Sequence, residues 1–336
     1  PLEVTGIDDF GVLQSTIPPF DGDTERSDAA SDRFREEIRE RMARSGSKHV
    51  YIYVHGYKVN FENPVLVASE LWHFLGYNGA FIAYSWPTKF SIWAYVADLE
   101  NAMNSARNLR TLILDIAEIP EVGKIHVIGY SAGTRLVSRM LADLGMYGYR
   151  LSKEDIDARV KLGNVILIGS DVDRSIMGGY LLDGALRIPE ALTIYQSQDD
   201  GALNMSRKIF RLERSGQMVI DGPLSPEEEK FFADHPHLWL IDVTNAEGGT
   251  DHGGHSYFRT SPWVSSDILM TLMYSLSPEE RGLVMYEDFP VWDFPEDYVP
   301  RLRSALAEVN PALGEAIREY EASLEAGEGE KDEESQ

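Results

Sequence analysis

Short apolar, β-rich runs alternate with longer segments of helical periodicity, and this alternation limits the fold more than any other feature. The β-rich runs are His49–Val54, Ala80–Tyr84, Lys124–Gly129, Val165–Ile168, Leu192–Tyr195 and Leu238–Val243. The segments expected to be helical are Ser31–Arg44, Asn63–Leu75, Ser91–Ile119, Thr134–Leu144 (closed by Gly145) and Pro262–Leu276. Uniformly apolar strands are typical of sheets buried on both faces, and helices between them provide the crossovers of parallel pairing. We therefore expect an α/β fold with a mainly parallel central sheet and helices on both faces.

The regions outside this alternation define the expected domain organisation. Residues 1–47 form an N-terminal lead-in and helix, and residues 48–276 form the main domain. Residues 201–237 separate two strands by far more than a usual connection, so we interpret them as either a lid or a surface insertion. Residues 277–324 form a C-terminal extension with a helix near Arg301–Leu324. Residues 325–336 hold six acidic residues and one basic residue, which predicts a disordered acidic tail.

Charge and composition exclude several classes of function. The chain has 55 acidic and 31 basic residues, a net charge of −24, which disfavours binding to nucleic acid or to anionic lipid. The absence of cysteine excludes disulfides, thiolate metal sites and a cysteine nucleophile. No apolar run approaches the roughly 18 residues of a membrane-spanning helix. The oligomeric state stays open, and both a cytoplasmic and an exported protein are compatible with a sequence that starts at Pro1.

The motif that carries chemistry is Gly129-Tyr130-Ser131-Ala132-Gly133. The pattern G-x-S-x-G is weak by itself, but here it follows a β-rich run and opens a helical segment, as a nucleophile elbow requires. Such a turn holds the serine in a strained backbone conformation and projects its side chain above the sheet. The glycines on either side let neighbouring backbone approach closely. The motif therefore predicts Ser131 as a nucleophile, with the helix N-terminus favouring negative charge that develops beside it.

A serine hydroxyl needs a base, and in this arrangement the chain order is serine, acid, histidine. His252 and His255 follow the sixth β-rich run, and we favour His255 because it directly precedes a helical segment. His235 and His237 precede that run and are interpreted as loop residues.

The acid that orients the base should follow the fifth β-rich run. Asp200 is preferred there and Asp199 is the second choice, while Asp171 and Asp173 after the fourth run are rivals. All four also fit the simpler interpretation of acids that cap loops.

Two backbone N–H groups should form an oxyanion hole, one from Ala132 and one from the loop at His55-Gly56-Tyr57. We assign the second donor to Tyr57 and expect His55 to brace the loop. Trp86 and Tyr130 are candidate pocket residues, although aromatic residues are more often part of a core.

Metal and cofactor chemistry find little support in the sequence. Asp251, His252 and His255 would need another ligand to hold zinc, and no H-E-x-x-H motif is present. No β-rich run is followed by G-x-G-x-x-G, which argues against a dinucleotide site. We therefore expect neither a metal nor a cofactor.

Several stretches together resemble a bacterial α/β-hydrolase family catalogued as a domain of unknown function and described as esterase- or lipase-like. They are Val54-His55-Gly56-Tyr57 with Asn60-Phe61, Tyr84-Ser85-Trp86-Pro87, Tyr95 and Asp98, Ile128 to Gly133, Asp171-Val172-Asp173, Ser197 with Asp200, Ala202 and Leu203, and His255-Ser256-Tyr257-Phe258. The resemblance covers roughly residues 48–260 and implies an α/β-hydrolase fold with the triad Ser131, Asp200 and His255. Many relatives look more like His-Ser-Met-Gly at the serine, so the residues that flank Ser131 differ.

These observations predict a serine hydrolase that needs no cofactor and cleaves small carboxylic esters through an acyl-enzyme. An amidase or a lipase would use the same triad, and the segment 201–237 could supply the lid of a lipase. A binding module on a hydrolase scaffold is the alternative from a different class. Acyl length and alcohol preference cannot be read from the sequence.

Overall fold

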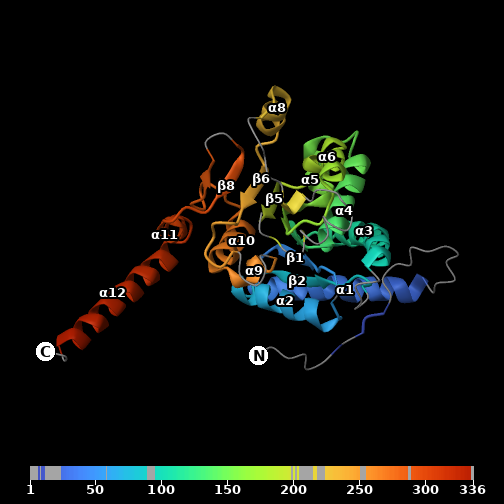
Figure 1. The fold of residues 1–336 in the computed structure, drawn as a ribbon. Helices are drawn as coiled ribbons and strands as arrows, with labels where there is room; N and C mark the ends of the chain where they lie inside the picture. The colour runs from blue at the N-terminus through green and yellow to red at the C-terminus, as the bar shows by residue number, and fades with distance from the viewer. Residues whose placement is uncertain are drawn as a thin grey trace.

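The strands of the computed structural model form one sheet (Figure 1). The structure describes residues 7, 9–11, 24–57, 59–88, 95–197, 200, 203, 215–217, 224–249, 255–286 and 289–333. Among these, the strands are β1 (His49–Val54), β2 (Ala80–Tyr84), β3 (Lys124–Tyr130), β4 (Leu162–Ile168), β5 (Ala191–Gln196), β6 (Leu238–Asp242), β7 (Val284–Met285) and β8 (Val291–Asp293). Their order across the sheet is β2-β1-β3-β4-β5-β6-β8-β7, and every pairing except β7 with β8 is parallel. The predicted mainly parallel α/β fold is confirmed.

Helices connect the parallel strands and cover the sheet. They are α1 (Thr24–Ser45), α2 (Glu62–Phe74), α3 (Tyr95–Ala117), α4 (Gly133–Tyr147), α5 (Lys153–Val160), α6 (Arg174–Leu182), α8 (Pro226–Asp234), α9 (Tyr257–Thr260), α10 (Pro262–Tyr274), α11 (Tyr298–Val309) and α12 (Pro311–Glu333). Short 3-10 turns lie at η2 (Ala185–Arg187) and η3 (Ser215–Gln217).

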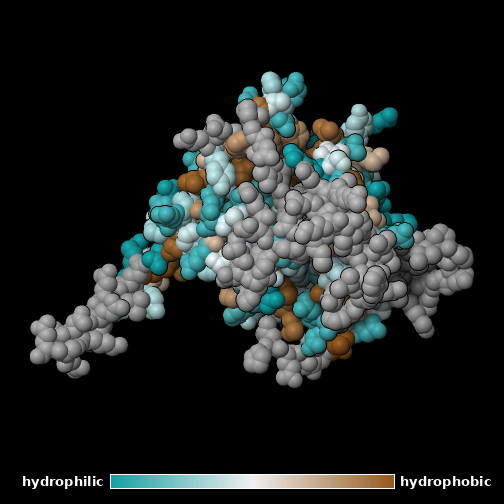
Figure 2. All heavy atoms as spheres, viewed as in Figure 1, coloured by the Kyte–Doolittle hydropathy of each residue, from teal (hydrophilic) through white to brown (hydrophobic). Residues whose placement is uncertain are grey.

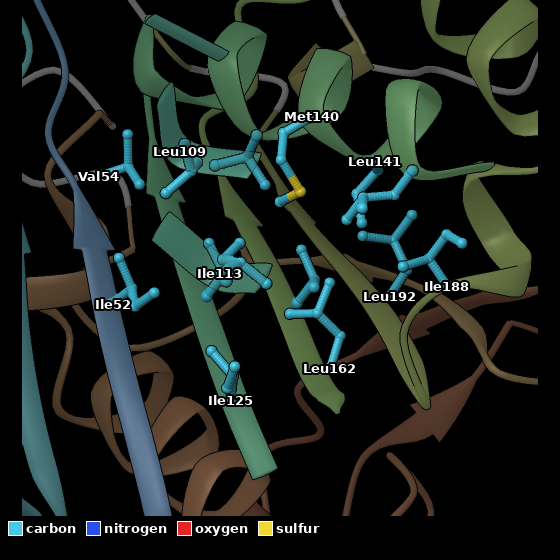
Figure 3. Close-up of a cluster of buried hydrophobic side chains, with 14 of the residues drawn as sticks. Ile52, Val54, Leu109, Ile113, Ile125, Met140, Leu141, Leu162, Ile188 and Leu192 are labelled. Carbon is cyan, nitrogen blue, oxygen red and sulfur yellow. The ribbon is translucent and has the colours of Figure 1, made fainter. Parts of the chain in front are cut away.

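Alternate residues of strands β1 to β6 enter two hydrophobic cores, one on each face of the sheet. The first core contains Ile52 and Val127 with side chains from α1, α3, α4 and η2. Figure 3 shows part of it, where Leu109 and Ile113 of α3 and Met140 of α4 lie over the strands. The second core contains Tyr53 and Ile128 with side chains from α2, α9, α10 and α11. Burial on both faces explains why these strands are apolar without polar alternation.

Gly145 does not close α4 as the sequence predicts, because the helix continues to Tyr147 and ends at Gly148. A Cβ on Gly145 would stand 2.7 Å from the carbonyl carbon of Gly184 in the turn before η2. Glycine at this position therefore permits a close contact between α4 and that turn.

The C-terminal region differs from the expectation in two ways. The strands β7 and β8 belong to the expected extension 277–324, and β8 pairs with β6, so this segment continues the sheet. The expected helix near Arg301–Leu324 is two helices, separated at Asn310, and α12 continues through residues 325–333, where the sequence predicts a disordered tail. Glutamate, alanine and lysine are good helix formers, so acidic composition alone does not exclude a helix. The helix α12 projects away from the rest of the molecule (Figure 1).

The visible surface mixes hydrophilic and hydrophobic residues, with the hydrophobic ones in small patches (Figure 2). Within the described ranges, we find no helix with the length and hydropathy that a membrane span requires.

Candidate active site

Ser131 lies on the turn between β3 and α4, and its backbone is in the left-handed region with φ of 52°. A residue other than glycine pays for this conformation in strain, and such strain persists only where the surrounding structure enforces it. The N–H of Ser131 donates to the carbonyl of Ile168 at 2.9 Å, which fixes the turn to the end of β4. The predicted strand-turn-helix context of Ser131 is therefore present.

The loop after β1 passes directly beside this turn. A Cβ on Gly56 would stand 2.9 Å from the Cβ of Ser131, and a Cβ on Gly133 would stand 2.4 Å from the carbonyl oxygen of His55. Both contacts are closer than ordinary Cβ contacts, so glycine permits them. Ala132 precedes the first turn of α4, where backbone N–H groups have no partner within the helix. The residues predicted to form an oxyanion hole, Tyr57 and Ala132, thus belong to two loops in close contact.

His55 and Trp86 fix the conformation of the β1 loop. The backbone N–H of Trp86 donates to Nε2 of His55 at 3.1 Å, and its indole N–H donates to the carbonyl of His55 at 2.7 Å. Because Nε2 accepts, the proton lies on Nδ1, which donates to the carbonyl of Gly56 at 2.7 Å. Burial lowers the pKa of His55, which keeps the ring neutral. Trp86 is buried in the first core and stacked on this ring, so it supports the loop from within the core.

His255 lies between the hydroxyl of Ser131 and the carboxylate of Asp200. Its Nε2 is 2.9 Å from Oγ of Ser131, and its Nδ1 is 2.6 Å from Oδ2 of Asp200. The His255 side chain is 16% exposed and that of Asp200 is fully buried. The other carboxylate oxygen of Asp200 accepts the N–H of Leu203 at 2.9 Å. A carboxylate, an imidazole and a hydroxyl therefore form one hydrogen-bonded chain, whose carboxylate end is buried while Ser131 and His255 are half-buried.

The alternative acids and histidines have other contacts. Asp171 accepts Nε of Arg135 at 3.1 Å, and Asp173 caps α6 by accepting the N–H groups of Ser175 and Ile176.

Of the histidines before β6, His235 contacts the carbonyl of Phe231 in α8 and His237 contacts the carbonyl of Leu186 in η2. The remaining rivals Asp199, Asp251 and His252 lie outside the described residues. Among the residues that are described, no group of three or more histidines, aspartates or glutamates is arranged to hold a metal ion.

Tyr130 lies beside the imidazole, with the ring centroids of Tyr130 and His255 5.2 Å apart. Its ring also contacts Phe258 at 4.7 Å. Burial raises the pKa of Tyr130 to about 12, so its phenol stays neutral. The candidate pocket residue Tyr130 is therefore at the site and shields one face of His255.

Sequence reasoning missed three further contributors to the site. Gly169 follows β4 with φ of 54°, and a Cβ there would stand 3.0 Å from Cε1 of His255. Ser215 and Gly216 of the segment 201–237 hydrogen-bond to the chain after β4, through the carbonyls of Val172 and Ser170. The sequence signal for Gly169 is its position directly after the apolar run Val165–Ile168. No local pattern marks Ser215 or Gly216.

A mainly parallel sheet covered on both faces, with a serine on a sharp strand-to-helix turn at its edge, defines the class of α/β hydrolases. A family described as alpha/beta hydrolase of unknown function (DUF900) matches residues 30–272. The chain belongs to this family.

Comparisons beyond the family are weak. A search of curated proteins gives no match. A lipase-esterase related protein from Clostridium acetobutylicum ATCC 824 is 12% identical, with 64% of this chain and 90% of that chain covered and a TM-score of 0.30. Esterase 2 of Thermogutta terrifontis in its apo form is 14% identical, with 69% and 85% covered and a TM-score of 0.33. Similarity at this level carries no conclusion about substrate.

Proposed function

We propose that this protein is a serine hydrolase that cleaves carboxylic esters of small molecules through an acyl-enzyme. The observation that carries the proposal is the hydrogen-bonded chain from Oγ of Ser131 through His255 to the buried Asp200. Ser131 and His255 are 124 residues apart in sequence, and His255 and Asp200 are 55 apart, yet the three side chains meet at one edge of the sheet. The carboxylate of Asp200 is fully buried and hydrogen-bonded to Nδ1 of His255, so it can stabilise an imidazolium that forms during the reaction.

In the first half of the reaction, Oγ of Ser131 attacks the ester carbonyl carbon while its proton moves to Nε2 of His255. Asp200 accepts the Nδ1 proton in a hydrogen bond, which holds the tautomer with a free lone pair on Nε2 and stabilises the imidazolium that forms. The tetrahedral intermediate then collapses, and the imidazolium gives its proton to the leaving alcohol. The acyl group stays on Ser131.

The negative oxygen of the intermediate needs donors that are already oriented. In the proposal, the backbone N–H groups of Ala132 and Tyr57 supply them, and the N-terminus of α4 adds a favourable dipole. The contacts of Gly56 and Gly133 support this assignment because they hold the β1 loop against the nucleophile turn.

In the second half, water replaces the alcohol. His255 takes a proton from the water as its oxygen attacks the acyl carbonyl, and then returns that proton to Oγ of Ser131. The products are the free enzyme and a carboxylic acid, which releases its proton to water and leaves as the carboxylate. A protein of net charge −24 favours the departure of an anionic product.

The test is a chain-length series of nitrophenyl esters with the wild-type protein and Ser131→Ala. We expect saturable hydrolysis by the wild type and a loss of roughly 10⁴- to 10⁶-fold in kcat for the variant. A fluorophosphonate probe should label Ser131 of the wild type, as located by peptide mass spectrometry, and should leave the variant unlabelled.

The same series separates the alternatives. If the protein hydrolyses matched ester and amide substrates at equal rates, it is an amidase and not a specific esterase. A jump in rate above the micelle threshold would indicate a lipase. A folded wild type that neither hydrolyses esters nor takes the probe would refute the enzyme and favour a binding module.

A further inference from the structure

The hydroxyl of Tyr257 connects three segments of the candidate site. Its oxygen accepts the backbone N–H of Gly169 at 2.7 Å and donates to the carbonyl of Tyr195 at 3.0 Å. Tyr257 follows His255 by two residues, Gly169 directly follows β4, and Tyr195 is the second-last residue of β5. One phenol oxygen thus joins the histidine segment to the ends of two neighbouring strands.

The end of β4 contacts Ser131, and the end of β5 leads to Asp200. The last residue of β4, Ile168, accepts the N–H of Ser131 at 2.9 Å. The strand β5 leads to Asp200, and the Cα of Gly169 supports the ring of His255, since a Cβ there would reach 3.0 Å from Cε1. Movement of Gly169 relative to Tyr195 would therefore change the spacing between the serine, the imidazole and the carboxylate.

The phenol is suited to this role because it stays protonated and inaccessible. Tyr257 is completely buried in the second core. Burial, reinforced by the charge of Asp200, raises the pKa of Tyr257 well above its ordinary value. The hydroxyl therefore keeps the proton that it donates to Tyr195, and no solvent competes for either bond.

We propose that Tyr257 is a positioning residue for the hydrolase: its hydroxyl fixes Gly169 against β5 and thereby holds the imidazole of His255 between Ser131 and Asp200. This role depends on the proposed function, since it concerns the geometry of the same three side chains. The hydroxyl of Tyr257 acts on the imidazole through Gly169, and its chain leads back to His255 two residues earlier.

The test is Tyr257→Phe, which keeps the ring and removes both hydrogen bonds. A displacement of the imidazole by about 1 Å lowers the rate roughly 100-fold. We expect kcat to fall by about 10- to 100-fold while KM stays within about threefold, because no substrate contact is removed. The concentration of active sites is measured by fluorophosphonate titration, so that loss of folded protein does not count as loss of kcat.

The matched control is Tyr298→Phe. Tyr298 is also completely buried in the second core, and its hydroxyl has no hydrogen-bond partner among the described residues. We expect its kcat and KM to equal those of the wild type.

A second readout is independent of turnover. The proton on Nδ1 of His255, held against Asp200, should give a separate low-field proton resonance in the wild type. This resonance should broaden or disappear in Tyr257→Phe and persist in Tyr298→Phe. If the resonance is lost in Tyr257→Phe and retained in Tyr298→Phe, but the wild type hydrolyses no ester, then Tyr257 positions His255 and the proposed function is wrong.

Unchanged kcat per active site, with an intact resonance, would overturn the positioning role even if Tyr257→Phe is less stable. Should Tyr257→Phe not fold, Gly169→Ala tests the contact through which Tyr257 would act, because its methyl group would stand 3.0 Å from Cε1 of His255 and push the imidazole away from Gly169. A kcat and resonance equal to those of the wild type in that folded variant would equally overturn the proposal.

Discussion

Gly133→Ala tests whether the β1 loop and the nucleophile turn must remain in close contact. The new Cβ would stand 2.4 Å from the carbonyl oxygen of His55 and 2.6 Å from that of Val54. These distances are about 1 Å short of van der Waals contact, and both neighbours are backbone atoms that cannot rotate away. The loop that carries Tyr57 must therefore shift by a similar amount. Loss of one oxyanion donor costs about 10²- to 10³-fold in kcat, or roughly 3–4 kcal/mol of barrier.

The assay is steady-state hydrolysis of a nitrophenyl ester, with urea unfolding of each variant in parallel. The control is Gly178→Ala, since Gly178 lies inside α6 and an added Cβ would meet no atom within 4 Å. That change removes backbone freedom from the unfolded chain and should stabilise the protein slightly without affecting kcat. If folded Gly133→Ala retains kcat within twofold of the wild type, the β1 loop does not supply an oxyanion donor.

Two predictions concern stability. Burial lowers the pKa of His126 to about 3, below its unfolded value near 6.5, so the unfolded chain binds the extra proton first as pH falls. The stabilisation from neutral His126 is complete above about pH 6.5 and declines by up to about 1.4 kcal/mol per pH unit below it. Urea unfolding of the wild type from about pH 7 to about pH 4.5 should show this decline in the free energy of unfolding. An equal decline in His126→Gln would contradict the assignment. Arg281 and Asp267 form a fully buried ion pair at 2.6 Å, so Arg281→Met should lower the free energy of unfolding by about 3–5 kcal/mol. The exposed pair of Arg44 with Glu40 provides the control, because Arg44→Met should leave the urea midpoint unchanged, and equal effects of the two variants would refute the argument from burial.

The central strands could be predicted from sequence because burial on both faces leaves an uninterrupted apolar run. The interior strand β1 (His49–Val54) has the predicted bounds, and so does the edge strand β2 (Ala80–Tyr84), although its residues are mostly half-buried. The strand β8 could not be predicted, since Val291–Asp293 is too short for periodicity and lies between prolines. Its place beside β6 depends on tertiary pairing, which local patterns do not contain.

The candidate site could be predicted as far as chain order and strand ends determine it. Ser131, Asp200 and His255 follow different strands, and the parallel topology brings the ends of those strands to one edge. Their roles in a reaction remain predictions. Tyr257 could not be singled out beyond its place in a family-like stretch, because its two partners lie 88 and 62 residues away.

Glycine explains how three loops can converge on one serine without enlarging the site. Gly56 contacts Ser131 itself, Gly133 contacts the β1 loop, and Gly169 contacts the imidazole, and at each a Cβ would come within 3.0 Å of its neighbour. If the backbones stood far enough apart for side chains at these positions, Nε2 of His255 could not remain at 2.9 Å from Oγ of Ser131. The close approach of these glycines to Ser131, to the β1 loop and to the imidazole therefore supports the hydrogen-bonded chain, and larger residues at these glycines should lower activity more than stability.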